Sequence, residues 1–312
     1  MSLLQLDNLK TYFDTRQGTV RAVDGVSLKL EKGETLGIVG ESGSGKSVTC
    51  YSLLRLIPQP PGRIVSGTAL FDSVDLLKIP KIHLNRIRAR KISMIFQDPM
   101  TSLNPTMTIG HQISEPLEIH KGLTRTQAMK QAIDLLHLVQ IPNPAMRAKQ
   151  YPHEFSGGML QRAMIAMAIG CEPSVLIADE PTTALDVTTQ VEVLAAMRSI
   201  VEKFNTAAIY ITHDLAVVAQ MADRIKVLRY GEEVEEANTR EMLSNPKEEY
   251  TKSLWSVRSL IKPEETNSEH MLSIKKIDAA YGSSKVLFDV SINIPKGKTV
   301  AIVGESGSGK ST

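Results

Sequence analysis

The chain of 312 residues has few cysteines, little net charge and no long hydrophobic run. Its two cysteines, Cys50 and Cys171, lie far apart, so neither a disulfide framework nor a zinc cluster is indicated, and a reducing compartment is expected. With 36 Lys and Arg against 34 Asp and Glu, the net charge of +2 provides no general field for nucleic acid or anionic lipid. Residues 1–7 lack a secretory pattern, and no run of about 18 apolar residues could span a bilayer. We expect a soluble chain that meets a membrane only through a partner and binds no nucleic acid.

One segment of the chain is repeated. Residues 21–47 and 285–311 align without a gap and are identical at 15 of 27 positions, which indicates duplication. Each copy contains two apolar segments around a Lys-Gly turn, and in the second copy we expect strands at 290–294 and 299–303. A long stretch of sequence follows the first copy, and only Thr312 follows the second.

This asymmetry predicts the domain organisation. We expect residues 1–256 to form one complete domain, residues 257–270 to form a linker, and residues 271–312 to be the incomplete start of a second domain. A natural C-terminal tail is the alternative to an incomplete second domain.

Residues 40–47 match the phosphate-loop pattern, between an apolar strand at 36–39 and a helix-like segment at 48–56. The glycines let backbone N–H groups and a helix N-terminus face one anion. Lys46 adds a charge for the β- and γ-phosphates, and the Ser47 hydroxyl can ligate Mg²⁺. A Gly/Ser linker would explain neither the Lys-Ser ending nor the preceding strand. The predicted ATP-binding residues are Gly40, Glu41, Ser42, Gly43, Ser44, Gly45, Lys46, Ser47 and Val48.

Two acidic residues end a short apolar run at 175–180. Such a run is typical of a buried strand that delivers its carboxylates to the C-terminal edge of a parallel sheet, where ligands bind. There Asp179 would hold Mg²⁺, and Glu180 would polarise the water that attacks the γ-phosphate. Alone, the pattern fits a capped core strand equally well. The phosphate loop upstream makes it the expected second half of an ATP site.

A third motif, Ser156-Gly157-Gly158-Met159, precedes an apolar segment that favours a helix. Ser156 is a good N-cap residue, and a helix that starts on two glycines presents free N–H groups and a positive dipole end to an anion. As a lone motif it would more often be an ordinary helix cap.

The order of these motifs resembles the nucleotide-binding domain of ATP-binding cassette (ABC) proteins over residues 1–256. The resemblance implies an α/β, P-loop NTPase fold of the ABC type, with a RecA-like core, an antiparallel β subdomain and a helical subdomain. The segment 107–140, which is mostly of helical period with Pro116 as a break, would form the helical subdomain that meets membrane subunits.

The resemblance also implies roles for individual residues. Gln97 matches the Q-loop residue that senses Mg²⁺ and the transport subunit, and His213 matches the switch histidine. Residues 156–159 match the signature that contacts the ATP of a partner cassette, with Met159 standing where many cassettes have Gln. Asp186 matches the D-loop. The aromatic residue that stacks on adenine maps to Phe13 or to Tyr12, and the two neighbours leave that choice open.

Within the family, residues 98–105, 152–159 and 178–187 resemble the group that powers peptide, nickel and glutathione importers. This implies ATP hydrolysis coupled to transport, with ATP and Mg²⁺ as cofactors, at the cytoplasmic face of the bacterial inner membrane. The implied partners are a second cassette, in the same full-length chain or in a homodimer, two transmembrane permease subunits and, indirectly, a solute-binding protein. The alternative is a soluble cassette protein acting on ribosomes or DNA. Those proteins usually carry long charged insertions or coiled coils, and no heptad run occurs here.

The second phosphate loop contains Gly304, Lys310 and Ser311 and repeats the first. We expect it to be non-functional in this chain, because a phosphate loop also needs the helix and the acidic strand that complete the site.

Overall fold

The computed structural model describes residues 2–182, 185, 187–256, 270–304 and 308–312. It divides into a larger unit, Met1–Leu185 with Glu192–Arg258, and a smaller unit, Asp186–Val191 with Ser259–Thr312. Within the described part of the chain, each helix is too short or too polar to cross a membrane.

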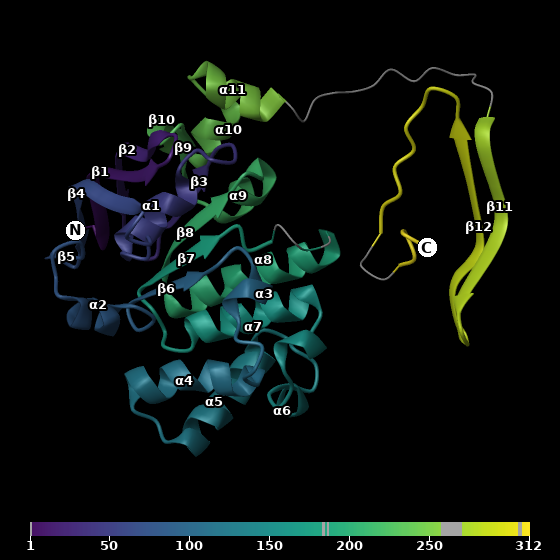
Figure 1. Cartoon of the computed structure of the whole chain (residues 1–312), viewed down its shortest axis with the longest axis horizontal. Helices are drawn as coiled ribbons and strands as arrows, with labels where there is room; N and C mark the ends of the chain where they lie inside the picture. The colour runs from purple at the N-terminus through teal and green to yellow at the C-terminus, as the bar shows by residue number, and fades with distance from the viewer. Residues whose placement is uncertain (1, 183–184, 186, 257–269, 305–307) are drawn as a thin grey trace. The chain divides into compact units, whose positions relative to one another are not determined.

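The centre of the larger unit is a six-stranded sheet with the strand order β10-β9-β3-β8-β7-β6 (Figure 1). Five strands are parallel, and β10 is antiparallel to β9. Every residue of β3, β7 and β8 is buried, as expected where both faces of a parallel sheet are covered. The strand bounds are β3 Thr35–Val39, β6 Ile92–Ile95, β7 Val175–Asp179, β8 Ala207–Thr212, β9 Arg224–Arg229 and β10 Glu232–Asn238.

A four-stranded antiparallel sheet with the order β2-β1-β4-β5 covers one face, and α1 lies in the same apolar core. Cys50 and Leu53 of α1 share that core with Ile38 of β3. The hydroxyls of Thr11 and Ser52, 2.8 Å apart, join β1 to α1. The bounds are β1 Leu4–Thr15, β2 Gly18–Leu30, β4 Gly62–Phe71, β5 Val74–Asp75 and α1 Lys46–Leu53.

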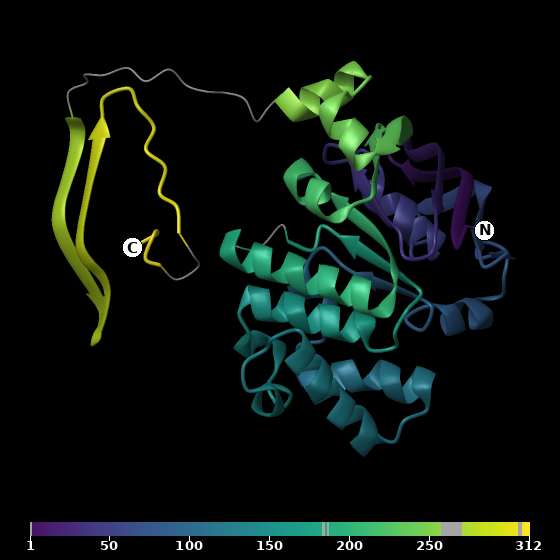
Figure 2. The same cartoon turned by 180° about the vertical axis from the view of Figure 1, so that it is seen from behind.

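Helices cover the other face. Neighbouring side chains on a strand point to opposite faces, so Val39 belongs to a different core from Ile38. Figures 1 and 2 show α7 and α8 side by side, with α4 and α5 beyond them. The bounds are α4 Ile109–Lys121, α5 Arg125–Leu138, α6 Pro144–Arg147, α7 Gly157–Ile169, α8 Val187–Phe204 and α9 Leu215–Met221. The remaining helices are α2 Lys81–Ile87, α3 Pro99–Ser102, η1 Pro152–Glu154, α10 Thr239–Ser244 and α11 Glu249–Ser256.

The prediction of a helix break at Pro116 is wrong, because α4 runs through this residue. Ile113 and Leu117 on either side of it are buried at 1% and 0% exposure, so packing outweighs the loss of one backbone donor. The helix ends instead at Gly122, whose left-handed backbone (φ 67°) is a common C-terminal stop. A capping box of Thr124 and Gln127 then starts α5.

The helix predicted at 48–56 begins and ends earlier in the structure, because α1 spans Lys46–Leu53 and starts inside the phosphate loop. The predicted start of α7 after Ser156 is confirmed.

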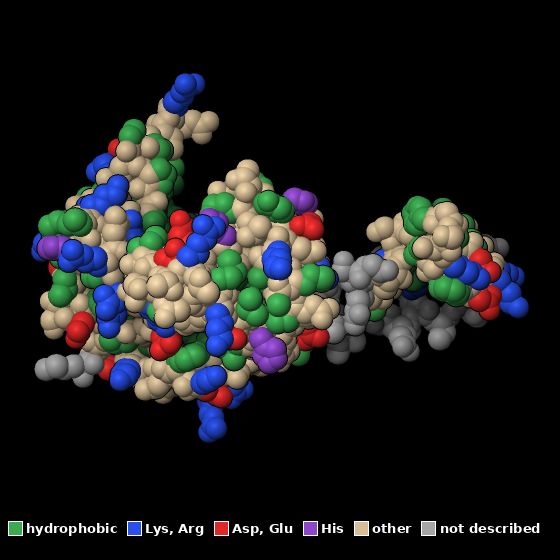
Figure 3. All heavy atoms as spheres, turned by 90° about the horizontal axis from the view of Figure 1, so that it is seen from below, with side chains coloured by type: hydrophobic (Ala, Val, Ile, Leu, Met, Phe, Trp, Pro, Cys, Tyr) green, Lys and Arg blue, Asp and Glu red, His purple; other side chains and the backbone are tan. Residues whose placement is uncertain are grey.

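On the face of the molecule drawn in Figure 3, acidic and basic side chains are interspersed.

The smaller unit contains an antiparallel hairpin of β11 (His270–Tyr281) and β12 (Ser284–Pro295). It repeats a detail of the β1–β2 hairpin. Asn8 and Lys276 both have a positive φ, and their backbone N–H groups donate to Ser27 Oγ and Ser291 Oγ at 3.0 Å in each copy.

The prediction of a strand at 299–303 is wrong, since this segment has no regular structure. The corresponding strand of the first copy, β3, is held between β8 and β9. Within 270–304 and 308–312 the structure forms only the hairpin, so this segment has no neighbouring strand to pair with.

Candidate functional site

Four parallel strands bring the predicted site together at one edge of the sheet. Val39 pairs with Thr212, and Asp179 pairs with Ile211, so the strands end side by side. The residues that follow β3, β6, β7 and β8 are the phosphate loop, the segment containing Gln97, Glu180 and His213. Parallel topology therefore gathers residues from four distant parts of the sequence.

The phosphate loop borders a pocket of about 170 Å³. Gln97 and Glu180 from the neighbouring strand ends complete its wall. The loop residues that line it are Ser42, Gly43, Ser44, Gly45, Lys46, Ser47 and Val48.

Two glycines of the loop are required by their surroundings. Gly40 and Gly45 have positive φ angles of 154° and 95°. A side chain at Gly40 would collide with the carbonyl oxygen of Leu228, and one at Gly45 with that of Ala22. Only glycine fits these two positions, which lets the backbone curl around the pocket.

Lys46 is buried at 6% exposure, and its ammonium group is held by backbone carbonyls. Its Nζ donates to the carbonyl oxygens of Gly40 and Glu41, both at 2.8 Å. Burial lowers the pKa of Lys46, and the nearby carboxylates of Glu180 and Asp179 oppose this shift. The ammonium group is therefore a positive charge fixed inside the loop.

Asp179, at the end of β7, is fully buried. The Ser47 hydroxyl donates to its Oδ1 at 2.7 Å, while Oδ2 is buried and accepts no hydrogen bond from the described residues. Burial raises the pKa of Asp179, and interactions of its carboxylate with the hydroxyls of Ser47 and Tyr51 oppose this shift. An orphaned carboxylate oxygen beside a hydroxyl is an oxygen donor set that fits a hard divalent cation such as Mg²⁺.

Glu180 is held between the other two predicted catalytic side chains. Gln97 Nε2 donates to its Oε2 at 2.9 Å, and His213 Nδ1 lies 3.2 Å from its Oε1. Its backbone has a positive φ of 45°, and its N–H donates to the carbonyl oxygen of Ile211 at 2.9 Å. The carboxylate is 14% exposed at the pocket, whereas His213 is 57% exposed.

The signature residues lie outside this pocket. Ser156 caps α7 by accepting a hydrogen bond from the Met159 N–H at 3.3 Å. Ser156 and Gly157 are exposed, and residues 156–159 are absent from the pocket wall. The helix start is thus open at the surface. Asp186, the D-loop prediction, lies outside the described residues.

The two aromatic candidates for adenine stacking have different surroundings. Tyr12 donates to Asp24 Oδ1 at 2.8 Å, and the guanidinium groups of Arg21 and Arg63 lie 5.7 Å from its ring centroid. Phe13 packs so close to Gly62 that a side chain at 62 would lie 2.9 Å from its ring. Tyr12 is engaged within its own sheet, Phe13 packs against Gly62, and neither ring lines the phosphate-loop pocket, so the adenine-stacking residue stays a prediction.

One contact to the loop was missed by the sequence analysis. The backbone N–H of Glu41 donates to Tyr250 Oη at 3.2 Å. Tyr250 lies on α11, 209 positions along the chain, and no local pattern signals such a pairing.

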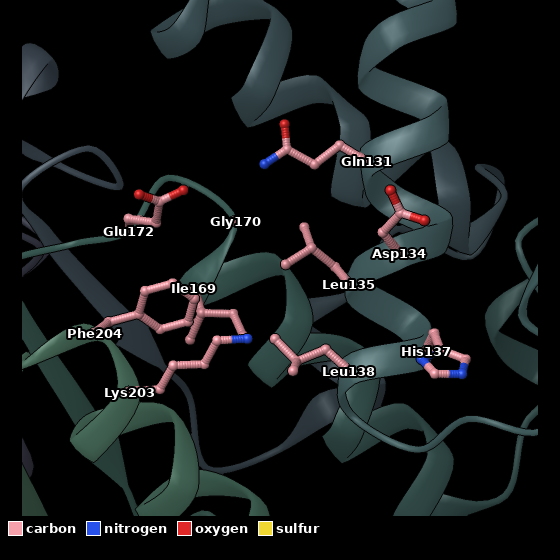
Figure 4. A pocket seen from close by; sticks show the side chains of 10 residues that line it. All are labelled: Gln131, Asp134, Leu135, His137, Leu138, Ile169, Gly170, Glu172, Lys203 and Phe204. Carbon is pink, nitrogen blue, oxygen red and sulfur yellow. The ribbon is translucent and has the colours of Figure 1, made fainter.

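A larger hollow of about 270 Å³ lies elsewhere, between α5, the end of α7 and the end of α8. Figure 4 shows Leu135 and Leu138 on one side of it, and Ile169 and Phe204 on the other. It contains none of the predicted site residues.

The second phosphate loop reproduces one bond of the first. Lys310 Nζ donates to the carbonyl oxygen of Gly304 at 2.8 Å, as Lys46 does to Gly40. Lys310 is exposed, in contrast to Lys46, and so is Ser311.

Comparison with known proteins gives the family. The family described as "ABC transporter" matches residues 23–183. The oligopeptide transport ATP-binding protein OppD of Bacillus subtilis is 48% identical over 271 residues, which cover 87% of this chain and 75% of OppD. The chain belongs to the ABC transporter family. As a member, it is an ATP-binding protein whose ATP hydrolysis is coupled to transport, which confirms the activity expected from its motifs.

Two further relatives of this ABC protein extend the comparison. The peptidoglycan transport ATP-binding protein YejF of Agrobacterium fabrum is 41% identical over 323 residues, covering 99% of this chain and 59% of YejF. The ATP-binding cassette MJ0796, solved as a dimer bound to ADP and Pi, superposes with a TM-score of 0.69 at 27% identity, covering 76% of this chain and 99% of that one. The predicted ABC-type α/β fold is confirmed.

Proposed function

We propose that this chain is the ATP-hydrolysing subunit of a peptide importer. The relative OppD is named an oligopeptide transport ATP-binding protein and is 48% identical to this chain over 271 residues. The observation that carries the enzymatic part is the position of Glu180. It lies at the rim of the phosphate-loop pocket and contacts both Gln97 and His213.

In the proposed binding mode, the triphosphate lies in the pocket lined by residues 42–48. Lys46 and the N–H groups of the loop neutralise the β- and γ-phosphates, and Phe13 stacks on adenine. Ser47, Asp179 and Gln97 would hold Mg²⁺, a role supported by the orphaned Oδ2 of Asp179. When bound, this ion neutralises charge that develops on the phosphates.

The proposed reaction needs few steps from the protein. Glu180 accepts a proton from a water molecule whose oxygen forms a bond to the γ-phosphorus. The bond from that phosphorus to the bridging oxygen breaks, so ADP and inorganic phosphate leave. Gln97 and His213 orient the Glu180 carboxylate through their hydrogen bonds to its two oxygens.

We propose that a second cassette completes the site. Ser156, Gly157, Gly158 and Met159 would contact the γ-phosphate bound by the partner, with Asp186 nearby. This is supported by the exposed start of α7 and by the dimeric state of MJ0796. The partner is either a homodimer mate or a cassette of the same chain. Residues 271–312 would be the opening of such a cassette, which is supported by the repeat of residues 21–47 at 285–311 and by the alignment with the longer YejF, which covers 99% of this chain.

The remaining proposed partners are two permease subunits at the cytoplasmic face of the bacterial inner membrane and, through them, a solute-binding protein. Residues 107–140, which include α4 and α5, would meet the permeases. A cassette protein acting on ribosomes or DNA is the competing function.

The test is affinity purification of the full chain from detergent-solubilised membranes, followed by peptide-dependent ATP hydrolysis of the purified complex in vesicles. Co-purification with two polytopic membrane proteins and stimulation by peptide are expected. Recovery with ribosomes instead, and no membrane protein, would refute the transport role.

A further inference from the structure

The peptide group between Gly40 and Glu41 is held from both sides. Its N–H, on Glu41, donates to Tyr250 Oη at 3.2 Å. Its carbonyl oxygen, on Gly40, accepts from Lys46 Nζ at 2.8 Å. Both distances are within the range of real hydrogen bonds. A single peptide plane therefore links the buried lysine of the phosphate loop to helix α11.

Tyr250 is itself held in place. The guanidinium of Arg229, at the end of β9, lies 4.4 Å from the centroid of the Tyr250 ring and 5.0 Å from that of Tyr230. The carboxylate of Glu235 accepts the backbone N–H groups of Lys247 and Glu248 at 2.9 and 3.1 Å, and thus caps the start of α11. Figure 1 shows α10 and α11 beside β10 and β9.

We propose that Tyr250 is a positioning residue that keeps the phosphate loop in its binding conformation. This inference rests on the proposed binding of ATP by residues 42–48. The pocket wall includes neither Glu41 nor Tyr250, so the bond lies outside the pocket proposed for the phosphates and can form whether or not they are bound.

A loop rich in glycine has many accessible conformations, and fixing one of them costs conformational entropy on binding. The hydrogen bond from the Glu41 N–H to Tyr250 is an anchor at the start of the loop, and it removes part of that entropy cost before the ligand binds. Glu180 is oriented by separate contacts to Gln97 and His213. Loss of the anchor should therefore weaken ATP binding and leave the chemical step unchanged.

Tyr250→Phe removes only the hydroxyl and keeps the ring on Arg229. Titration of the full chain with a fluorescent ATP analogue should show a Kd about fivefold higher, equivalent to about 1 kcal/mol for one neutral hydrogen bond. KM for ATP should rise equally, with kcat unchanged. Tyr230→Phe is the matched control, because it makes the same chemical change on the second tyrosine ring near Arg229, and its Kd should stay within about twofold of the original.

Wild-type affinity in Tyr250→Phe would overturn the proposal, as would a lower kcat at unchanged KM or an equal shift in Tyr230→Phe. If Tyr250→Phe does not fold, Arg229→Ala provides the same test, because it frees the Tyr250 ring. It must then raise Kd, and an unchanged Kd overturns the proposal. Lys46→Ala separates failure of the proposed function from failure of this inference. An unmutated chain that binds no analogue refutes the proposed function. Binding that Lys46→Ala abolishes, with wild-type affinity in Tyr250→Phe, refutes this inference alone.

Discussion

The replacement Glu180→Gln tests the proposed catalytic base with little structural disturbance. Glutamine has the same shape, and its carbonyl oxygen can accept the hydrogen bond that Gln97 Nε2 now donates to Glu180 at 2.9 Å. Its amide nitrogen can donate to His213 Nδ1, which lies 3.2 Å from the other carboxylate oxygen, once the imidazole carries its proton on Nε2 instead of Nδ1. Because both contacts survive, the variant should fold and bind ATP as the original chain does.

Glu180→Gln should lower the rate of the chemical step. A positioned general base contributes about 10²–10⁴ to a rate, which corresponds to about 3–5 kcal/mol of activation free energy. Lys46, Ser47 and the loop N–H groups are untouched, so ground-state binding does not change. We expect hydrolysis to fall at least about a hundredfold while nucleotide affinity stays within about twofold.

The assay is steady-state phosphate release in a dimerisation-competent complex, paired with titration of a labelled ATP analogue. Glu202→Gln is the matched control, since this exposed residue pairs only with Arg198 on the same helix among the ion pairs of the described chain. It should leave phosphate release unchanged. Phosphate release from Glu180→Gln close to that of the unmutated protein, at equal affinity, would remove Glu180 from the catalytic role.

Three further predictions follow from the site. Ser156→Arg should spare nucleotide affinity in the isolated chain and abolish ATP-dependent dimerisation measured by light scattering; reduced monomer affinity would place the signature in the chain's own site. Lys46→Ala should abolish binding of a labelled ATP analogue, and Lys310→Ala should leave it unchanged; two nucleotides per chain, with Lys310→Ala halving that number, would contradict this. Burial raises the pKa of Asp179, so protonation of this carboxyl stabilises the fold; the stabilisation is complete below the unfolded pKa of about 3.9 and is lost as pH rises through the folded pKa. Asp179→Asn should therefore raise the unfolding temperature of the nucleotide-free chain at pH 7, by an amount that shrinks as pH falls through the folded pKa, and should abolish stabilisation by Mg²⁺. A difference in unfolding temperature that does not change with pH would refute the raised pKa of Asp179.

The grouping of the candidate site residues at one edge of the sheet was predictable, because the sequence patterns that mark them are local. Each of Lys46, Glu180 and His213 follows an apolar run that forms a strand, and parallel strands necessarily end at one edge. The short apolar runs of β3, β7 and β8 left little choice of structure. The α/β fold was implied by the family resemblance that the order of the motifs carries.

What the sequence did not predict depends on contacts between distant residues. The helix through Pro116 is sustained by burial of Ile113 and Leu117, which a local rule for proline does not include. The anchor at Tyr250 needs α11 to dock beside β9 and β10, and nothing in residues 249–256 marks a partner 209 positions away. The strand predicted at 299–303 failed because a strand needs a hydrogen-bonded neighbour as well as an apolar sequence.

The two phosphate loops separate what a motif specifies from what a site requires. Residues 40–47 and 304–311 are identical, and in both the lysine donates to the first glycine carbonyl at 2.8 Å. That bond forms within the loop and so needs nothing beyond the local sequence. Burial of the lysine differs, because Lys46 is 6% exposed beside Asp179 and Glu180, whereas Lys310 is exposed. Coulombic attraction for phosphate is screened by water at an exposed ammonium and is stronger at a buried one. We therefore expect the sheet that surrounds the motif to be needed for nucleotide binding, which the eight residues alone should not support.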